Sequence, residues 1–292
     1  MRSWLAQYEL RSASDLGDAL ALLSASPGEW TPFAGGTDLM VLLEAGKLPQ
    51  RRLLDLWQIN ELRGIVVSSD AVTIGALATY TDLLTDPAMA AEFPLVCAAA
   101  RETGAVAIQN RGTVGGNIAN ASPAADLPPA LLVYDAALDL ASARGRRRIP
   151  YESFHLGYKT MDLAPDELIV SITLPRRRRI KAADETTPPR TESYRKVGTR
   201  RAQAISKICF AAALDLDGTL VGDIRIALGS VAPTVVRARS AEASLRGRAI
   251  GPQTIAAARS ALATDISPID DIRSSADYRL RVAGNLLEEF LS

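Results

Sequence analysis

The sequence has few of the residues from which metal centres and hydrolytic sites are built. Among its 292 residues there is one histidine, His155, and there are two cysteines, Cys97 and Cys209. Zinc and iron–sulfur sites need grouped cysteine or histidine ligands, so the sequence excludes both on this chain. A Ser-His-Asp hydrolase would have to use His155, yet no G-x-S-x-G motif is present. We therefore expect His155 to be a structural or surface residue.

The sequence also lacks long apolar runs. No stretch of 18 or more apolar residues occurs, so no membrane span is expected. The first residues contain no continuous apolar segment of the kind that signal peptides have. Both cysteines lie in apolar stretches, which is typical of reduced, buried thiols. These features predict a cytoplasmic protein without a disulfide framework.

Two nucleotide-binding motifs are absent, and the charge is unevenly distributed. The sequence contains neither G-x-x-x-x-G-K-[ST] nor G-x-G-x-x-G, which excludes a P-loop and a standard Rossmann turn. Residues 1–140 carry 8 lysines and arginines against 16 acidic residues, and residues 141–292 carry 25 against 17. Two arginine runs, at 144–148 and 176–179, have no interleaved aromatics, so nucleic-acid binding is not expected. They are either solvated turns or a docking face for an acidic partner subunit.

The feature with most chemical content is a pair of glycine loops about eighty residues apart. The first is FAGGTD at 33–38, and the second is TVGGNI at 113–118. Adjacent glycines let backbone N–H groups approach a ligand closely, and such a loop at the start of a helix is a common anion site. Two loops together suggest a long, doubly charged ligand such as a dinucleotide pyrophosphate. The alternative for either loop alone is a tight turn that simply requires glycine.

Each loop makes a specific prediction. In the first, the N–H groups of Gly35, Gly36 and Thr37 would face a phosphate. Asp38 is unfavourable beside an anion, so we expect it to cap the following helix by accepting backbone N–H bonds. In the second loop, four residues would face the ligand from the other side: Thr113, Gly115, Gly116 and Asn117.

Periodicity divides the chain into three blocks and a connector. Residues 1–58 form a strand–loop–helix–strand unit, with helices at 16–23 and 38–44 and strands at 30–34 and 52–59. Residues 59–175 contain a hairpin around 68–70, helices at 81–84, 89–102 and 126–134, and strands at 137–141 and 167–174. Residues 176–192 are charged, contain proline and lack periodicity, as expected of a linker or loop. Residues 193–292 contain a hairpin at 205–231, with Asp217-Gly218 suited to a type I′ turn, then helices at 241–246, 252–263 and 276–291. In the last helix, Leu280, Ala283, Leu287 and Phe290/Leu291 are expected to form one apolar face.

With these motifs in place, the chain resembles the FAD-binding medium subunits of the molybdenum hydroxylases, the carbon monoxide dehydrogenase and xanthine dehydrogenase family. The resemblance rests on five stretches: PFAGGTDL (32–39), IQNRGTVGGNIANASPAADLPPALLVYDAALDL (108–140), DELIVSITLP (166–175), YRKVGTRRAQAISKICFAAAL (194–214) and DYRLRVAGNLLEEFL (277–291). It implies an α+β protein with a two-subdomain FAD-binding fold of the vanillyl-alcohol-oxidase type. A C-terminal domain of antiparallel sheet and helices would follow.

The resemblance also implies a role. Such subunits bind FAD noncovalently, take electrons from [2Fe-2S] clusters in a small subunit and pass them to an external acceptor. Hydroxylation occurs at a molybdopterin centre in a large subunit, and the complex is a dimer of heterotrimers. Two alternatives remain open at this point: a self-sufficient flavin oxidoreductase of the same fold, and an assembly subunit with a degenerate flavin site.

Residue by residue, the resemblance assigns cofactor contacts. Asp126 matches an acidic residue that hydrogen-bonds the flavin, with Ser122 a weaker candidate. Ile169 falls where an aliphatic side chain packs near the isoalloxazine ring. Lys196 falls where a lysine by the flavin would raise its potential, the alternative being an exposed strand lysine. The pyrophosphate-binding segment would comprise Pro32, Phe33, Ala34, Gly35, Gly36, Thr37, Asp38 and Leu39.

Overall fold

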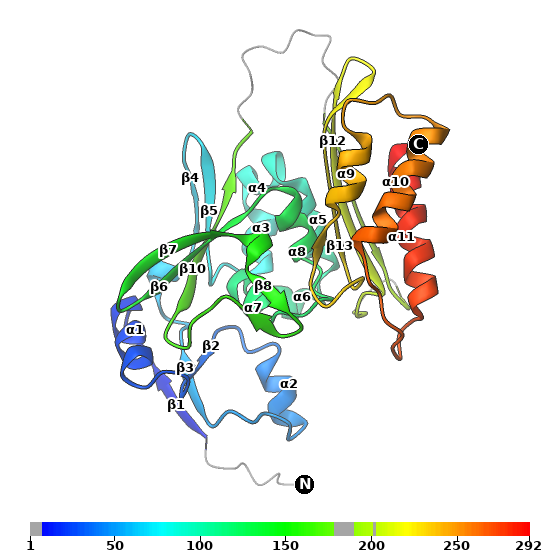
Figure 1. Ribbon diagram of the computed structural model, residues 1–292. Coiled ribbons are helices and arrows are strands. Elements are labelled where there is room, and N and C mark those ends of the chain that lie inside the picture. Colours follow the sequence, from blue (N-terminus) through cyan, green and yellow to red (C-terminus); the bar gives the residue numbers. More distant parts are fainter. Residues whose placement is uncertain (1–7, 178–189, 201–202) are drawn as a thin grey trace.

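The computed structural model describes residues 8–177, 190–200 and 203–292. Its strands form a three-stranded, a five-stranded and a four-stranded sheet, together with a two-stranded hairpin. Figure 1 shows the small sheet at the N-terminal end, the five-stranded sheet beside it, and the four-stranded sheet with its helices on the other side. The mixed helix and sheet content agrees with the α+β class expected from the sequence.

The N-terminal unit is a parallel sheet with two helices. Its strands lie in the order β1-β3-β2. Helix α1 begins after its N-cap Asp15, whose side chain accepts from the backbone N–H of Asp18, and buries Leu16, Ala19 and Leu23. The strand β1 was not predicted, because all four of its residues are exposed and give no alternation. The elements are β1 (Glu9–Ser12), α1 (Leu16–Ala25), β2 (Thr31–Phe33), α2 (Leu39–Glu44) and β3 (Arg52–Asp55).

The second unit is an antiparallel sheet covered by short helices. Its strand order is β4-β5-β10-β6-β7, and the predicted hairpin around Ser68–Asp70 joins β4 to β5. The strands are β4 (Ile65–Val67), β5 (Ala71–Gly75), β6 (Ala137–Ser142), β7 (Gly145–Pro150) and β10 (Leu168–Pro175), with the hairpin β8 (His155–Gly157) and β9 (Thr160–Met161). The helices are α3 (Tyr80–Thr85), α4 (Pro87–Glu92), α5 (Pro94–Glu102), α6 (Val106–Gln109), α7 (Val114–Ala119) and α8 (Pro128–Val133).

Two predictions in this unit are wrong. The expected helix over 89–102 is broken into α4 and α5 at Phe93, because Pro94 lacks an N–H group and disfavours a helical conformation in the residue before it. The arginine run at 144–148 is not a solvated turn. Most of it belongs to β7, where Arg147 binds Asp162 and Glu167, and Arg148 binds Asp139.

The C-terminal domain has a four-stranded antiparallel sheet in the order β11-β12-β13-β14. Its elements are β11 (Thr191–Val197), β12 (Ile208–Asp217), β13 (Leu220–Gly229), β14 (Val236–Arg237), α9 (Arg239–Leu245), α10 (Pro252–Asp265) and α11 (Ala276–Leu291). Strand β11 begins inside the connector expected at 176–192. Residues 178–189 of that connector lie outside the described residues.

The predicted β12–β13 hairpin is confirmed, but its turn differs. Asp217 pairs with Leu220, so Gly218 and Thr219 form the loop. Gly218 has a φ of +59° and Thr219 has no positive φ, whereas a type I′ turn needs two positive values. On α11, Ala283 and Leu287 are buried as expected, while Leu280 is 40% exposed and is not part of the apolar face.

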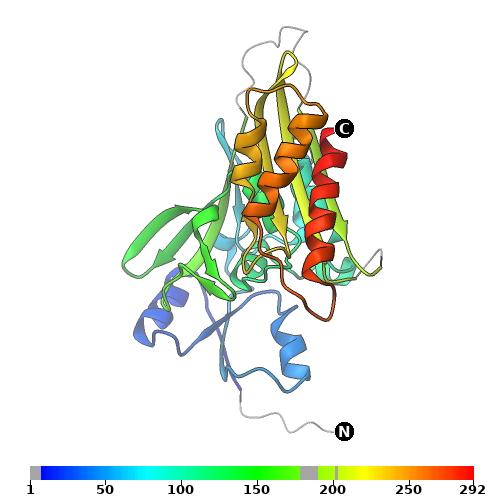
Figure 2. The same cartoon turned by 45° about the vertical axis from the view of Figure 1, so that its right-hand side comes forward.

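The four-stranded sheet is packed on both faces. Figure 2 shows α9, α10 and α11 lying together against one face. Strand β12 alternates accordingly: Phe210 and Leu214 join the core beneath these helices, whereas Ala211 and Ala213 join the core of the second unit, where α8 packs against β12 and β13. Small side chains on that face let the C-terminal domain approach the second unit closely.

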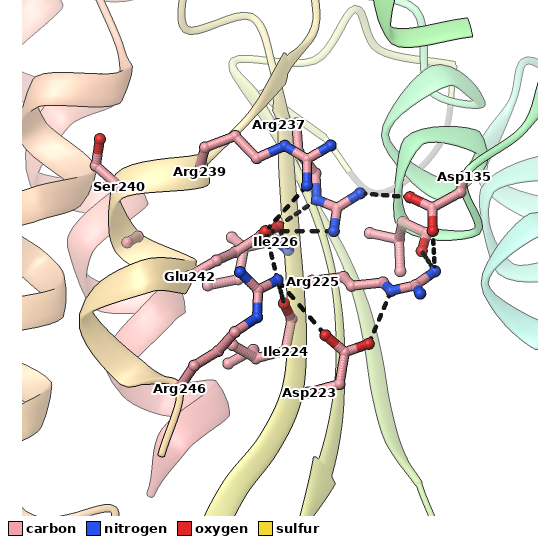
Figure 3. Close-up of polar contacts among 12 residues, drawn as sticks. Asp135, Asp223, Ile224, Arg225, Ile226, Arg237, Arg239, Ser240, Glu242 and Arg246 are labelled. Carbon is pink, nitrogen blue, oxygen red and sulfur yellow. Dashed lines mark hydrogen bonds and ion pairs between the residues drawn. The ribbon is translucent and has the colours of Figure 1, made fainter. Parts of the chain in front are cut away.

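A buried charge network also crosses this boundary (Figure 3). Arg237 pairs with the fully buried Glu242 and with Asp135 at the end of α8. Arg237 Nη1 also donates to the carbonyl of Leu132 at 3.0 Å. Because each buried charge has a partner, the network joins the two units without an unpaired ion.

Candidate functional site

The structure brings the two glycine loops side by side. A Cβ atom added to Gly35 would lie 1.7 Å from the carbonyl oxygen of Arg111, just before the second loop. The amide of Asn120, at the end of α7, donates to Asp38 Oδ1 across 3.3 Å. Residues about eighty positions apart therefore line one site, and Gly35 permits an approach that no other residue allows.

The first loop leaves its backbone donors available. Within the described chain, the N–H groups of Gly35, Gly36 and Thr37 donate to no protein group. Gly36 has a φ of +75°, in the region that favours glycine. Asp38 precedes α2 but makes no capping bond with its side chain, so the expected cap is wrong. Its carboxylate instead accepts from Asn120.

The second loop behaves differently. It forms the first turn of α7, with Thr113 as an N-cap whose hydroxyl accepts from the N–H of Gly116 at 3.1 Å. The N–H of Gly115 donates to Ala76 O at 2.8 Å, and a Cβ on Gly115 would lie 2.7 Å from the Ala76 side chain. These glycines serve close packing, and their N–H groups are already bonded within the chain.

One side chain of the second loop is nevertheless unsatisfied. Asn117 Oδ1 is buried and has no hydrogen-bond partner. Asn117 also contacts the hydroxyl of Tyr80, whose pKa is raised chiefly by burial. A buried polar atom without a partner is rare in native proteins, so Asn117 marks a place where a ligand would supply the missing donor.

Sequence reasoning missed two residues that join this region. Lys159 Nζ lies 2.5 Å from both the carbonyl and the side-chain oxygen of Asn120. Lys159 therefore links the β8–β9 hairpin to α7, and Asn120 continues the chain of contacts to Asp38. Lys159 has a φ of +56°, which is uncommon for lysine. Lys159 lies outside every motif of the sequence, and Asn120 lies within the stretch 108–140 without being singled out there.

Asp126 and Lys196 form a buried ion pair. Their Oδ2 and Nζ atoms are 2.6 Å apart, and the side chains are 11% and 7% exposed. Lys196 Nζ also donates to the carbonyl of Glu102 at 2.8 Å. The alternative of an exposed strand lysine is therefore wrong.

The remaining predicted residues are less tightly connected to the loops. Ser122 accepts from the N–H of Ala124 in a local turn. Ile169 is buried in the core on β10, next to an irregularity in the register. His155 packs against Tyr151 and bonds the carbonyl of Ile118, and burial lowers the pKa of its imidazole, so its role is structural.

Other kinds of site find little support in the described ranges. In residues 8–177, 190–200 and 203–292, no three or more His, Cys, Asp or Glu side chains are grouped to hold a metal ion. Over the same residues, no helix is long and apolar enough to cross a membrane. Both cysteines are free and buried, as expected. Two surface hollows, beside β7 and between α10 and α11, contain no residue of the glycine loops.

The residues at the loops fit the FAD that the resemblance implies. The first loop has unbonded N–H groups that could bind an anion, and Gly35 and Gly36 have no Cβ atom to block it. Asn117 Oδ1 has no hydrogen-bond donor within the described chain. FAD carries both an anionic pyrophosphate and hydrogen-bond donors on its ring and ribityl chain. Both halves of the site therefore match chemical groups of this cofactor.

Comparison with known proteins gives the same class. Residues 6–177 match the family described as the FAD binding domain in molybdopterin dehydrogenase, and residues 192–292 match the CO dehydrogenase flavoprotein C-terminal domain. The chain belongs to the FAD-binding medium subunits of the CO/xanthine dehydrogenase family of molybdenum hydroxylases, which are components of oxidoreductases.

Individual relatives align over nearly the whole chain. The putative xanthine dehydrogenase FAD-binding subunit of Escherichia coli K12 is 32% identical over 281 residues, covering 96% of this chain and 93% of its own. The carbon monoxide dehydrogenase medium chain of Hydrogenophaga pseudoflava is 31% identical, with 98% and 96% covered. A solved structure of carbon monoxide dehydrogenase from that organism matches with a TM-score of 0.90, 32% identity, and 97% and 96% coverage.

Proposed function

We propose that this FAD-binding subunit is an electron-transfer component. It would take electrons from [2Fe-2S] clusters of a small partner subunit and deliver them to an external acceptor. Substrate hydroxylation would occur at a molybdopterin centre in a large partner subunit, within a dimer of heterotrimers. The observation that carries the proposal is the pairing of a loop with unbonded N–H groups and a second loop with an unsatisfied Asn117, in a chain that offers no metal cluster in its described residues.

The chain's own residues would bind and orient the cofactor. The N–H groups of the first loop would hold the pyrophosphate, since oriented backbone dipoles stabilise anions without a counter-charge. Bound FAD supplies the chemistry of accepting and releasing electrons. We propose as cofactor contacts Pro32, Phe33, Ala34, Gly35, Gly36, Thr37, Asp38, Leu39, Thr113, Gly115, Gly116, Asn117, Ser122, Asp126, Ile169 and Lys196.

The domain limits and the compartment belong to the same proposal. Residues 1–58 and 59–175 would be the two FAD-binding subdomains, and residues 193–292 the C-terminal domain. The match boundaries at 177 and 192 support the separation of the C-terminal domain from the FAD-binding part. The two unpaired, buried thiols accord with a reducing compartment such as the cytoplasm.

The proposal can be tested on the complex purified with its partner subunits. FAD content is measured first, followed by anaerobic reduction of the iron–sulfur centres with a stoichiometric reductant while the flavin absorbance is monitored. Flavin bleaching after cluster reduction, and recovery on adding an acceptor, is the expected result. A complex that contains FAD whose absorbance stays constant while acceptors are reduced would contradict the electron-transfer role.

A further inference from the structure

Four side chains of the C-terminal segment surround Asp126, the acidic residue between α7 and α8. Its carboxylate accepts from Lys196 Nζ at 2.6 Å, Ser206 Oγ at 2.6 Å and Cys209 Sγ at 3.1 Å. Its main-chain carbonyl accepts from the Tyr194 hydroxyl at 2.9 Å. Ser206 is 1% exposed and Cys209 is fully buried. The C-terminal domain therefore determines the surroundings of a residue that belongs to the FAD-binding part.

Cys209 acts here as a hydrogen-bond donor and not merely as a small apolar residue. It lies on the face of β12 that carries Ala211 and Ala213 toward the FAD-binding unit, and its Sγ is 3.1 Å from Ser206 Oγ. Burial, reinforced by the charge of Asp126, raises the pKa of the Cys209 thiol. The thiol therefore stays protonated and can donate a hydrogen bond to Asp126.

Ser206 and Cys209, which both donate to Asp126 Oδ1, restrict the orientation of the carboxylate more than Lys196 alone can. Lysine is a point charge on a flexible stem, and Lys196 also satisfies the carbonyl of Glu102. Ser206 and Cys209 converge on the other carboxylate oxygen and fix the plane of the group. An ionised carboxylate has about four acceptor positions. Three protein donors therefore leave capacity for one further donor.

We propose that Ser206 and Cys209 are positioning residues for the cofactor, which hold the Asp126 carboxylate so that its remaining acceptor position faces a ring N–H of FAD. This rests on the proposed flavin site. Because both donors come from the C-terminal domain, the domain completes a site whose glycine loops lie elsewhere in the chain. Displacing β12 would loosen Asp126 without touching those loops.

The test compares four variants of the full chain. Cys209→Ala and Ser206→Ala each remove one donor, while Cys209→Ser keeps a donor at the same position. Cys97→Ala is the matched control, since Cys97 is also a buried thiol, but its hydrogen bond goes to the Leu83 carbonyl at 3.5 Å and not to Asp126. Three quantities are measured: the Kd for FAD by fluorescence titration, the midpoint potential of bound flavin by spectroelectrochemistry, and the Tm of the apoprotein.

We expect Cys209→Ala and Ser206→Ala each to raise the Kd for FAD about tenfold, as the loss of one hydrogen bond to a charged group implies, and to shift the flavin potential. Cys209→Ser should stay within about twofold of wild type, and Cys97→Ala should change neither quantity. A lower Tm with unchanged Kd and potential in both alanine variants overturns the proposal. A wild-type chain that retains no FAD overturns the flavin site itself, which is a separate result.

Discussion

A single methyl group at Gly35 should displace the first glycine loop. The Cβ atom of Gly35→Ala would begin 1.7 Å from the Arg111 carbonyl oxygen, and real Cβ contacts essentially never fall below 3.0 Å. The opposing atom is backbone and cannot rotate away. One loop must therefore retreat from the other by more than 1 Å, and the N–H groups of residues 35–37 move with it.

The size of the effect follows from what the loop donates. Hydrogen bonds to a charged group contribute about 1.5–3 kcal/mol each. Losing two such bonds to the pyrophosphate costs about 3–6 kcal/mol, which weakens FAD binding roughly 10²–10⁴-fold. Overpacking of this kind also destabilises a fold by about 1–3 kcal/mol, so the apoprotein should still fold with a Tm lowered by several degrees.

The assay is a titration of apoprotein with FAD, followed by flavin fluorescence, with the Tm recorded in parallel. Gly251→Ala is the matched control, because nothing lies within 4 Å of an added Cβ there and its φ of −169° suits any residue. The control should bind FAD as wild type does. If Gly35→Ala binds FAD with the wild-type Kd, the assignment of the first loop as the anion site is refuted.

Three further outcomes are expected. Asn117→Ala should raise the Kd for FAD, because it removes the buried oxygen that has no partner within the described chain; a wild-type Kd for FAD would contradict this. Glu242→Ala removes the fully buried partner of Arg237 and leaves that arginine only the half-exposed Asp135, so it should cost about 3–5 kcal/mol in urea unfolding. The exposed control Glu288→Ala should cost about 0–1 kcal/mol. Burial alone would raise the pKa of Asp271, but hydrogen bonds from backbone N–H groups and Arg279 outweigh it and lower that pKa from 3.8 to about 2. Its contribution to stability is therefore present above pH 3.8 and lost as the pH falls toward 2, so Asp271→Asn should flatten the acid side of the Tm profile.

Helices with strong periodicity were predictable from the sequence, and tertiary contacts explain most of the failures. The helices at 252–263 and 276–291 were found because their apolar residues repeat at helical spacing. Strand β1 has no buried residue, so its pairing with β3 leaves no mark in its own composition. Strand β7 was missed because two of its arginines, Arg147 and Arg148, pair with acidic residues elsewhere in the chain.

The candidate site was predictable only in part. The glycine motifs located both loops, but only the structure separates their roles, since Gly35 contacts the backbone near Arg111 and Gly115 contacts Ala76. Lys196 and Asp126 were named from the family resemblance, while their direct pairing across 70 positions was not. Lys159 lies outside every motif, and Ser206 lies within the stretch 194–214 with no role that the motif assigns. The places of both residues depend on the packing of whole elements.

The two loops therefore differ in what they can donate to a ligand. This difference predicts which part of the chain binds the pyrophosphate and which binds the ring of FAD. The first loop has free backbone donors but an acidic residue, Asp38, beside it. Asn120 donates to that carboxylate and is itself held by Lys159. The N–H groups of Gly115 and Gly116 in the second loop are bonded within the chain, so this loop can offer a ligand the side chain of Asn117. Binding of the pyrophosphate should accordingly depend on the N–H groups of the first loop. The ring end should depend on Asp126 and the C-terminal domain that holds it, so damage to β12 should alter the potential of the flavin before it alters phosphate binding.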